Sequence, residues 1–308
     1  MGLALLELGC LETLRDGDAE NTERLLLEAL ETLRKGHFLG EQAVSSDIAF
    51  AFVCIAEYYD AKGDRGTAAD YFKKVDAMLG RIQKRNHSIR ARMYLFLADY
   101  LLRRGGFSMA EELYQKALNE TRNAYGSSAQ NSLVGDIQQS LGLLRRRRND
   151  YVGALSLFEE ALMIDDAVHG TADARGAAIA MWNIARVRQD QGNLDGAKEM
   201  LSEALRIFKG VYGEESTSRE VLQVEKQLTL LKNLPPLVRA AWVGDVPSVA
   251  NQLKEGAEIE VTAADGSTAL SKAAAVGQLD VVELLLEKGA NAETATATQR
   301  TPLHYAAQ

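Results

Sequence analysis

Apolar positions in residues 1–233 recur with the period of amphipathic helices, and short polar or glycine-containing turns interrupt them at regular distances. Apolar residues flank each turn at three- and four-residue spacings, which predicts two antiparallel helices joined tightly. The turn starts are 46, 42, 44 and 43 residues apart, at Gly17-Asp18, Gly63-Asp64, Gly105-Gly106, Asn149-Asp150 and Gly192-Asn193. Self-similarity at such a period predicts a stack of helix pairs.

The same kinds of side chain return at fixed distances from each turn. Small residues stand five positions after most turn starts, at Ala68, Ala110, Ala154 and Ala197. Large apolar residues stand nine positions after them, at Leu26, Phe72, Tyr114, Phe158 and Leu201. Small residues let helices approach closely, and large ones fill the space between helices. We therefore expect Phe72, Tyr114 and Phe158 to be buried in the stack.

This pattern resembles the tetratricopeptide repeat, and its spacing, above the usual length of about 34 residues, resembles the longer variant of kinesin light chains. The resemblance implies five helix pairs within 1–233. Asn183 stands where the kinesin-type repeat carries an Asn that lines its groove. Residues 216–232 predict one further amphipathic helix, which would cover the last apolar face of the stack.

After Asn233-Leu234-Pro235-Pro236 the period changes to 33 residues, because Gly244 returns at Gly277 and Thr268 at Thr301. The segments Asp265–Leu270, Val281–Ala290 and Thr301-Pro302-Leu303-His304 resemble ankyrin repeats, although Thr298-Gln299 replaces the Asp-Gly of the third hairpin tip. The resemblance implies two full ankyrin repeats and a truncated third in 236–308. Because the chain stops inside a helix of the third repeat, we expect a fragment of a longer protein.

The sequence thus predicts an all-α tandem α-solenoid, in which a tetratricopeptide-like superhelix (1–233) precedes a short ankyrin-repeat stack (236–308). Only Asn233–Pro235 separates the two repeat types, and consecutive prolines restrict the chain there. We expect the helix at 216–232 to pack directly on the first ankyrin unit, which would give one elongated body.

Composition narrows the functional classes. Two cysteines in 308 residues predict a disulfide-free, cytoplasmic protein. There is no signal-peptide pattern and no run of about 18 apolar residues, which predicts that the protein has no membrane partner. The net charge of −8, from 35 basic and 43 acidic residues, argues against nucleic-acid partners.

No catalytic or metal-binding motif stands out. His37, His87, His169 and His304 fall in different repeats, and none has metal-ligand spacing with another His or Cys. Neither a phosphate loop nor a Gly-x-Ser-x-Gly turn is present in the sequence. We therefore predict that the chain is not an enzyme and has no cofactor and no metal site, with the histidines in structural roles.

The first helix of each tetratricopeptide-like pair lines a concave groove in the family that the sequence resembles. Groove positions carry arginines among acidic and polar residues, and arginine offers planar bidentate donors to carboxylates. This predicts protein or peptide partners, including acidic segments. Alternatively, Arg145–Arg148 is a solvated helix end that the helix dipole favours. The candidate groove residues are Arg103, Gln139, Arg146, Arg147, Trp182, Asn183 and Arg186.

Trp242 is a further candidate, with two interpretations. At its position in an ankyrin repeat it would be exposed on the concave side, where a Trp is a common binding hot spot. Alternatively, it packs on the helix at 216–232. The sequence as a whole predicts an interaction scaffold or adaptor. The competing hypothesis is a ligand-sensing or autoinhibitory region of a larger signalling protein, such as a nucleotide-switch protein.

Overall fold

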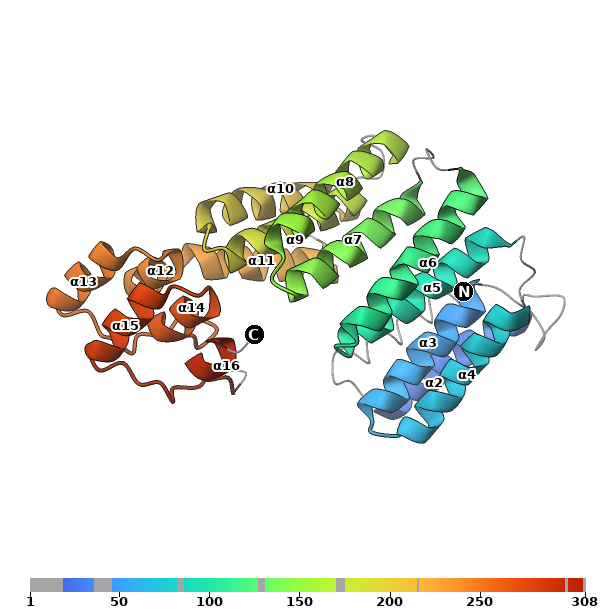
Figure 1. The fold of residues 1–308 in the computed structure, drawn as a ribbon, viewed down its shortest axis with the longest axis horizontal. Helices are drawn as coiled ribbons and strands as arrows, with labels where there is room; N and C mark the ends of the chain where they lie inside the picture. Colours follow the sequence, from blue (N-terminus) through green and yellow to red (C-terminus); the bar gives the residue numbers. More distant parts are fainter. Residues whose placement is uncertain are drawn as a thin grey trace. The chain divides into compact units, whose positions relative to one another are not determined.

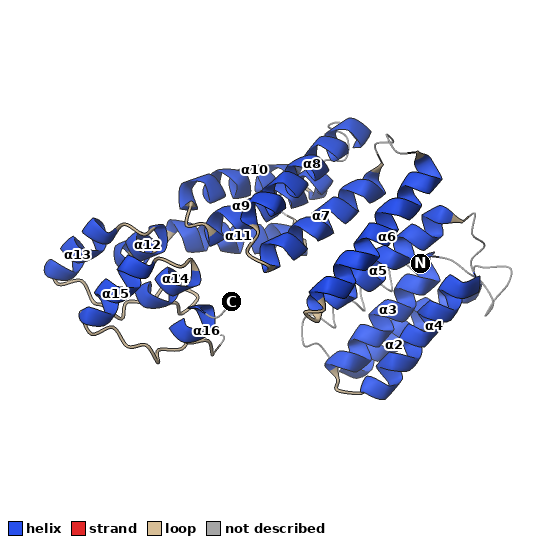
Figure 2. Cartoon of the chain, viewed as in Figure 1, coloured by secondary structure: helices blue, strands red, loops and turns tan. Residues whose placement is uncertain are grey.

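The computed structural model describes residues 19–35, 46–81, 86–126, 131–169, 175–214, 216–296 and 299–306. In these ranges every regular element is an α-helix, as Figures 1 and 2 show, and extended pairing is limited to one isolated bridge between Thr262 and Thr268. Helix follows helix in tandem along the described chain. The protein is therefore an all-α tandem solenoid, as its repeats predict.

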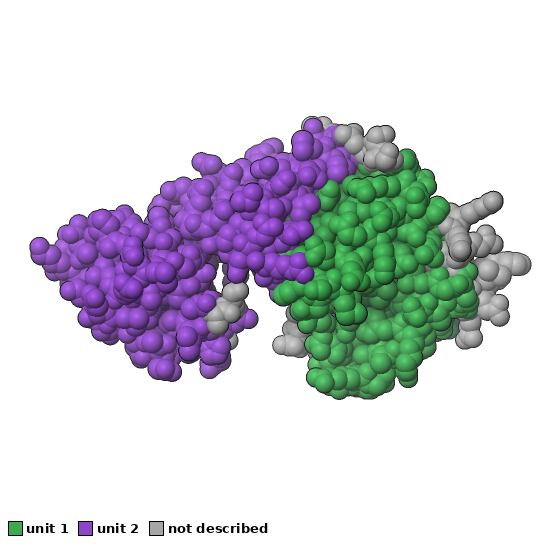
Figure 3. All heavy atoms as spheres, viewed as in Figure 1, with its two compact units in different colours: residues 1–144 green, residues 145–308 purple. Residues whose placement is uncertain are grey.

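The helices divide into two compact units, residues 1–144 and residues 145–308 (Figure 3). The predicted boundary between repeat types, at residues 233–236, lies inside the second unit. This division follows the density of contacts rather than the type of repeat, so the predicted domain limits 1–233 and 236–308 remain a prediction.

Unit 1 is built from long helices that pack side by side. Within it, α3 contacts α2, α4 and α5, and α5 packs along α6. The first helix of the first predicted pair precedes Ala19 and lies outside the described residues. The helices are α2 (Ala19–Lys35), α3 (Ser46–Ala61), α4 (Arg65–Arg81), α5 (His87–Arg103), α6 (Phe107–Tyr125) and most of α7 (Ser132–Arg147).

Unit 2 begins with long helices and continues with short ones. In it α9 packs between α8 and α10, α10 packs on α11, and α14 contacts α12, α15 and α16. The long helices are α8 (Tyr151–His169), α9 (Arg175–Asp190), α10 (Leu194–Tyr212) and α11 (Arg219–Lys232). The short helices are α12 (Pro236–Val243), α13 (Val246–Lys254), α14 (Ala269–Ala275), α15 (Leu279–Glu287) and α16 (Pro302–Ala306).

The turns between paired helices explain their sequence signature. Gly192, between α9 and α10, has a φ of +75°, a conformation that glycine adopts without steric cost. Asn149, between α7 and α8, has a φ of +59°, and Asn is among the few residues that tolerate this region. The first helices α3, α5, α7, α9 and α11 consequently recur at the long spacing, beginning at Ser46, His87, Ser132, Arg175 and Arg219.

The predicted core positions are largely correct. Tyr114 and Phe158 are 0 % exposed. Phe72 is only partly buried, so that prediction was wrong in degree; its ring centroid lies 4.2 Å from that of Tyr100 on α5. The aromatic positions of the repeat therefore form the core of both units, although not equally.

Helix α11 is the predicted covering helix, with a start at Arg219 rather than residue 216. The later start has a local cause, because the Ser218 side chain accepts a hydrogen bond from the Val221 backbone N–H at 3.4 Å and caps the helix. Its apolar face is buried as the sequence predicts, through Val221, Val224, Leu228 and Leu231.

Candidate functional site

All the candidate groove residues lie on first helices, as predicted. Arg103 is the last residue of α5, and Gln139 lies in the part of α7 that belongs to unit 1. The others belong to unit 2: Arg146 and Arg147 at the end of α7, Trp182, Asn183 and Arg186 on α9, and Trp242 on α12.

In unit 1 the groove arginines are neutralised within the chain. Arg103 forms an ion pair with Glu57 of α3, where the side chains are 53 % and 27 % exposed. The next residue, Arg104, pairs with Asp60 of α3 at 3.0 Å. Both guanidinium groups therefore already have carboxylate partners within the chain.

Asp99 of α5 has a structural role. Its carboxylate accepts a hydrogen bond from the hydroxyl of the fully buried Tyr114 at 2.7 Å, and another from Ser140. Burial raises the pKa of the Asp99 carboxyl, while these hydrogen bonds and Arg103 oppose the increase. Asp99 therefore satisfies a polar group of the core.

In unit 2, Arg146 is fixed by a carboxylate one repeat later in the chain. Its Nε lies 2.5 Å from Oδ2 of Asp190, and its Nη2 lies 3.1 Å from Oδ1 of the same carboxylate. The Arg146 side chain is 18 % exposed and that of Asp190 30 %. This two-point pairing joins the end of α7 to the end of α9 and gives Arg146 a defined orientation.

Arg186 differs from Arg103 and Arg146, because it makes no hydrogen bond or ion pair with any residue in the described part of the chain. Burial lowers the pKa of its guanidinium to about 10, with Arg146 and Arg147 adding to this effect and Asp190 opposing it. The exposed Arg147 has no such partner among the described residues either. Unit 2 therefore brings Arg146 and Arg147 close enough to Arg186 to interact electrostatically, with Asp190 paired to Arg146.

Trp182 and Asn183 precede Arg186 on α9. The Trp182 indole donates a hydrogen bond to Oε1 of Gln227 on α11 at 3.0 Å, and its ring meets Phe208 edge-on at 6.5 Å between centroids. Asn183 is 5 % exposed, and its side chain makes no hydrogen bond with the described residues. Trp182 thus packs against α10 and α11, whereas the amide of Asn183 has donors and an acceptor that the described residues do not use.

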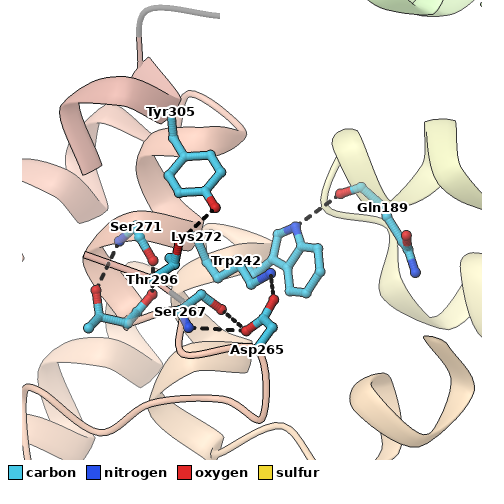
Figure 4. Close-up of polar contacts among 9 residues, drawn as sticks. Gln189, Trp242, Asp265, Ser267, Ser271, Lys272, Thr296 and Tyr305 are labelled. Atoms are coloured by element: carbon cyan, nitrogen blue, oxygen red, sulfur yellow. Dashed lines mark hydrogen bonds and ion pairs between the residues drawn. The ribbon is translucent and has the colours of Figure 1, made fainter. Parts of the chain in front are cut away.

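Trp242 is buried rather than exposed, so the prediction of an accessible hot spot was wrong. It is 7 % exposed and belongs to the core cluster of α9, α10 and α11. Its indole N–H donates to the backbone carbonyl of Gln189 at 3.0 Å, as Figure 4 shows. On the other side, the Lys272 ammonium lies 4.0 Å from the ring centroid and 2.9 Å from Asp265. The structure supports the second interpretation, in which Trp242 packs at the junction.

The junction between long and short helices is tightly packed. Leu230 and Leu234 pack against the core of the short helices, which confirms the predicted direct packing of α11. Arg239 of α12 pairs with Asp195 of α10 at 2.9 Å. A Cβ at Gly192 would come within 2.8 Å of the Trp242 carbonyl oxygen, so glycine is required there for close approach as well as for its φ.

Comparison with known families agrees with this arrangement of helices. Residues 133–210 match the family model "Tetratricopeptide repeat", and residues 237–308 match "Ankyrin repeats (3 copies)". The chain carries tetratricopeptide repeats followed by ankyrin repeats. Both kinds of repeat are generally protein–protein interaction modules and are typically non-catalytic.

A solved structure similar to these tetratricopeptide and ankyrin repeats is the crystal structure of BtubC (BKLC) from P. vanneervenii. The two chains share 16 % sequence identity and a TM-score of 0.54, over 89 % of this chain and 93 % of that one. At this identity the likeness shows the fold alone. No curated protein matches the chain.

Of the remaining polar candidates, two histidines have visible structural contacts. In the ankyrin segment, Nδ1 of His304 lies 2.8 Å from the Thr301 hydroxyl, and His87 lies 2.6 Å from Glu120. The side chains of His37 and His169 lie outside the described residues. Among the residues that the structure does describe, no group of three His, Cys, Asp or Glu side chains could hold a metal, and no helix is long and apolar enough to cross a membrane.

Proposed function

We propose that the chain is a scaffold or adaptor that binds acidic segments of protein partners along the first helices of its tetratricopeptide repeats. The observation that supports this most is the arginine cluster of unit 2, defined as Arg146, Arg147 and Arg186. Only Arg146 of these has a carboxylate partner among the described residues. Guanidinium groups left without a counter-ion on a binding surface favour carboxylate or phosphate ligands.

The proposal assigns different roles to the candidate residues. Arg147, Asn183 and Arg186 would contact the partner, since their donors are unused in the described part of the chain. Arg103 is paired with Glu57, and Trp242 is buried at the junction, so neither is part of the proposed surface. We also propose that the protein is non-catalytic and cytoplasmic, in keeping with its repeat types and its cysteine usage.

Charge reversal of the cluster tests this proposal. The double variant Arg147→Glu/Arg186→Glu should reduce binding to captured partners at least tenfold, because each lost charge-assisted hydrogen bond contributes about 1.5–3 kcal/mol. Partners would be captured by affinity purification with mass spectrometry, and their affinities measured with purified proteins. Wild-type affinity should fall as salt increases, since exposed charges are screened beyond about 10 Å at 0.1 M.

The matched control is Arg206→Glu/Lys254→Glu, which reverses two exposed charges on second helices of the same unit. This control should bind like the wild type. The cluster variant should keep the wild-type melting temperature, because Arg186 and Arg147 make no ion pair with the described residues. The control should change it little, because the Arg206–Glu203 pair that it breaks is solvent-exposed. If the cluster variant folds and binds its partners normally, the binding surface lies elsewhere and the proposal is wrong.

A further inference from the structure

The carboxylate of Asp190 lies beside the arginine cluster, and it pairs with Arg146 but not with Arg186. Arg186 and Asp190 are four residues apart on α9, a spacing that places their side chains next to each other on one face. At this spacing an Arg and an Asp can form an ion pair, although the order with the arginine first is the less favourable one. Here both carboxylate oxygens of Asp190 are engaged by Arg146, at 2.5 and 3.1 Å.

Arg186 is consequently left without a counter-ion in a half-buried position. A charge removed from water is costly unless it is paired, and two neighbouring arginines increase that cost. Burial as well as these neighbours accounts for the lowered pKa of the Arg186 guanidinium. An arrangement that is unfavourable in the free protein becomes favourable when an anion reaches it.

A second polar group points to the same location. Asn183 lies three residues before Arg186 on α9, hence on the same face of the helix. It is 5 % exposed, and its amide makes no hydrogen bond within the described part of the chain. Its amide donors and acceptor are therefore available to a ligand that reaches Arg186.

We propose that Arg186, with Arg147 and Asn183, binds one oxyanion of an acidic partner, and that Asp190 is an internal competitor that withholds Arg146 from it. This inference rests on the proposed function and adds a regulatory residue to the same site. The ligand chemistry is an oxyanion on a protein segment, either a carboxylate or a phosphate, because the planar guanidinium fork fits both.

If Asp190 competes with the ligand, then neutralising its carboxylate should increase the affinity for an acidic segment. In the Asp190→Asn variant the Arg146 guanidinium loses its charged partner and becomes available to the ligand. Affinity for an acidic segment should then increase several-fold. Arg186→Gln should have the opposite effect and raise the Kd about tenfold, since it removes a charge-assisted hydrogen bond.

The experiment measures fluorescence anisotropy with three fluorescein-labelled peptides and the full chain. One peptide is rich in glutamate, the second has glutamine in place of each glutamate, and the third carries a phosphoserine among neutral residues. The first and third separate a carboxylate from a phosphate source, and the second should not bind. The matched controls are Arg206→Gln and Glu203→Gln, which alter an exposed ion pair on α10, and both should bind like the wild type.

Arg186→Lys provides a second variant that retains the positive charge and loses the planar fork. It should bind the peptides with intermediate affinity and should melt like the wild type. Equal affinity of wild type and Arg186→Gln would overturn the inference. So would an Asp190→Asn variant that binds more weakly, since Asp190 would then help to build the site. If neither anionic peptide binds the wild type, the oxyanion site is absent, whereas partner capture with the charge-reversed variant still decides the proposed function.

Discussion

Replacing Trp242 by alanine is expected to destabilise unit 2 by roughly 3–5 kcal/mol, the range for removing a buried Trp side chain. The ring is 7 % exposed and belongs to the apolar cluster formed by residues of α9, α10 and α11. The indole also donates to the Gln189 carbonyl at 3.0 Å. Alanine therefore creates a cavity and leaves a backbone acceptor without its donor.

Because repeat arrays do not unfold in one cooperative step, the effect is best measured by native-state hydrogen exchange. Amides of α9, α11 and α12 should lose protection, and those of unit 1 should not. Trp242→Phe should cost less than alanine, about 1–3 kcal/mol, since it keeps an aromatic ring while removing the N–H donor and part of the buried ring volume. The neighbouring Val243 is 47 % exposed, and Val243→Ala should stay within about 0.5 kcal/mol of the wild type.

Unchanged protection in the Trp242→Ala variant would mean that the ankyrin repeats are held to α11 by other contacts. The candidates are then Leu230 and Leu234, which pack against the ankyrin core, and the ion pair between Arg239 and Asp195. In that event the contribution of Trp242 to the stability of the junction would be small.

The fold could be predicted from the sequence because its determinants are local and repeated. At the described turns between paired helices a Gly or Asn adopts a positive φ, and small residues follow the turn at a fixed offset. Ser218 shows the limit of this reasoning, since one capping hydrogen bond moved the start of α11 by three residues relative to the prediction.

The site could be predicted less well, because its charges are set by contacts between repeats. Glu57 is 46 residues from Arg103, and Asp190 is 44 from Arg146. Both separations are about one repeat, so an acid near the same offset in the adjacent repeat was the available signal. Whether such an acid forms an ion pair with the arginine depends on side-chain geometry, which cannot be deduced from sequence spacing. Arg186 is an example, because it lies four residues from Asp190 and does not pair with it.

Whether Trp242 is buried or exposed could likewise not be predicted from the ankyrin repeat in which it lies. Its position in the ankyrin pattern favours exposure. However, the first ankyrin repeat follows a tetratricopeptide repeat rather than another ankyrin repeat. The turn at Gly192 and the carbonyl of Gln189 provide that neighbour. A terminal repeat therefore cannot be interpreted from its family pattern alone, because the pattern describes contacts between ankyrin repeats.

Phe158→Ala is the second substitution for which we expect a large effect, a loss of roughly 3–5 kcal/mol in the stability of α8 and its neighbours. Phe158 is 0 % exposed, and the residues flanking it on the same face of α8 are Ala154 and Ala161, at 0 % and 1 %. The partly buried Leu155 and Leu162 lie one turn away from the ring on either side. Alanine at this position would leave a cavity beside the small residues Ala154 and Ala161.

The control for this variant is Met163→Ala, which removes a flexible side chain of comparable length from the same helix at a position that is 63 % exposed. It should change stability by no more than about 0.5 kcal/mol. Phe158→Leu should lie between the two, because leucine keeps part of the buried volume. The free energies would come from hydrogen exchange of amides in α8 and α9, helices that pack on each other.

The Phe158 result also tests the repeat register on which the groove assignment depends. The turn at Asn149-Asp150 fixes both which side chains of α8 face the core and which arginines at the end of α7 face the groove. A measured loss below about 1 kcal/mol would mean that Phe158 is not at a core position, given the usual range for a buried Phe. The turn would then be misplaced, and Arg146 and Arg147 would lose their assigned face together with it. A loss in the expected range, with the stability of Met163→Ala unchanged, supports both the core assignment of Phe158 and the groove assignment of Arg146 and Arg147. Both depend on the position of the single turn between α7 and α8.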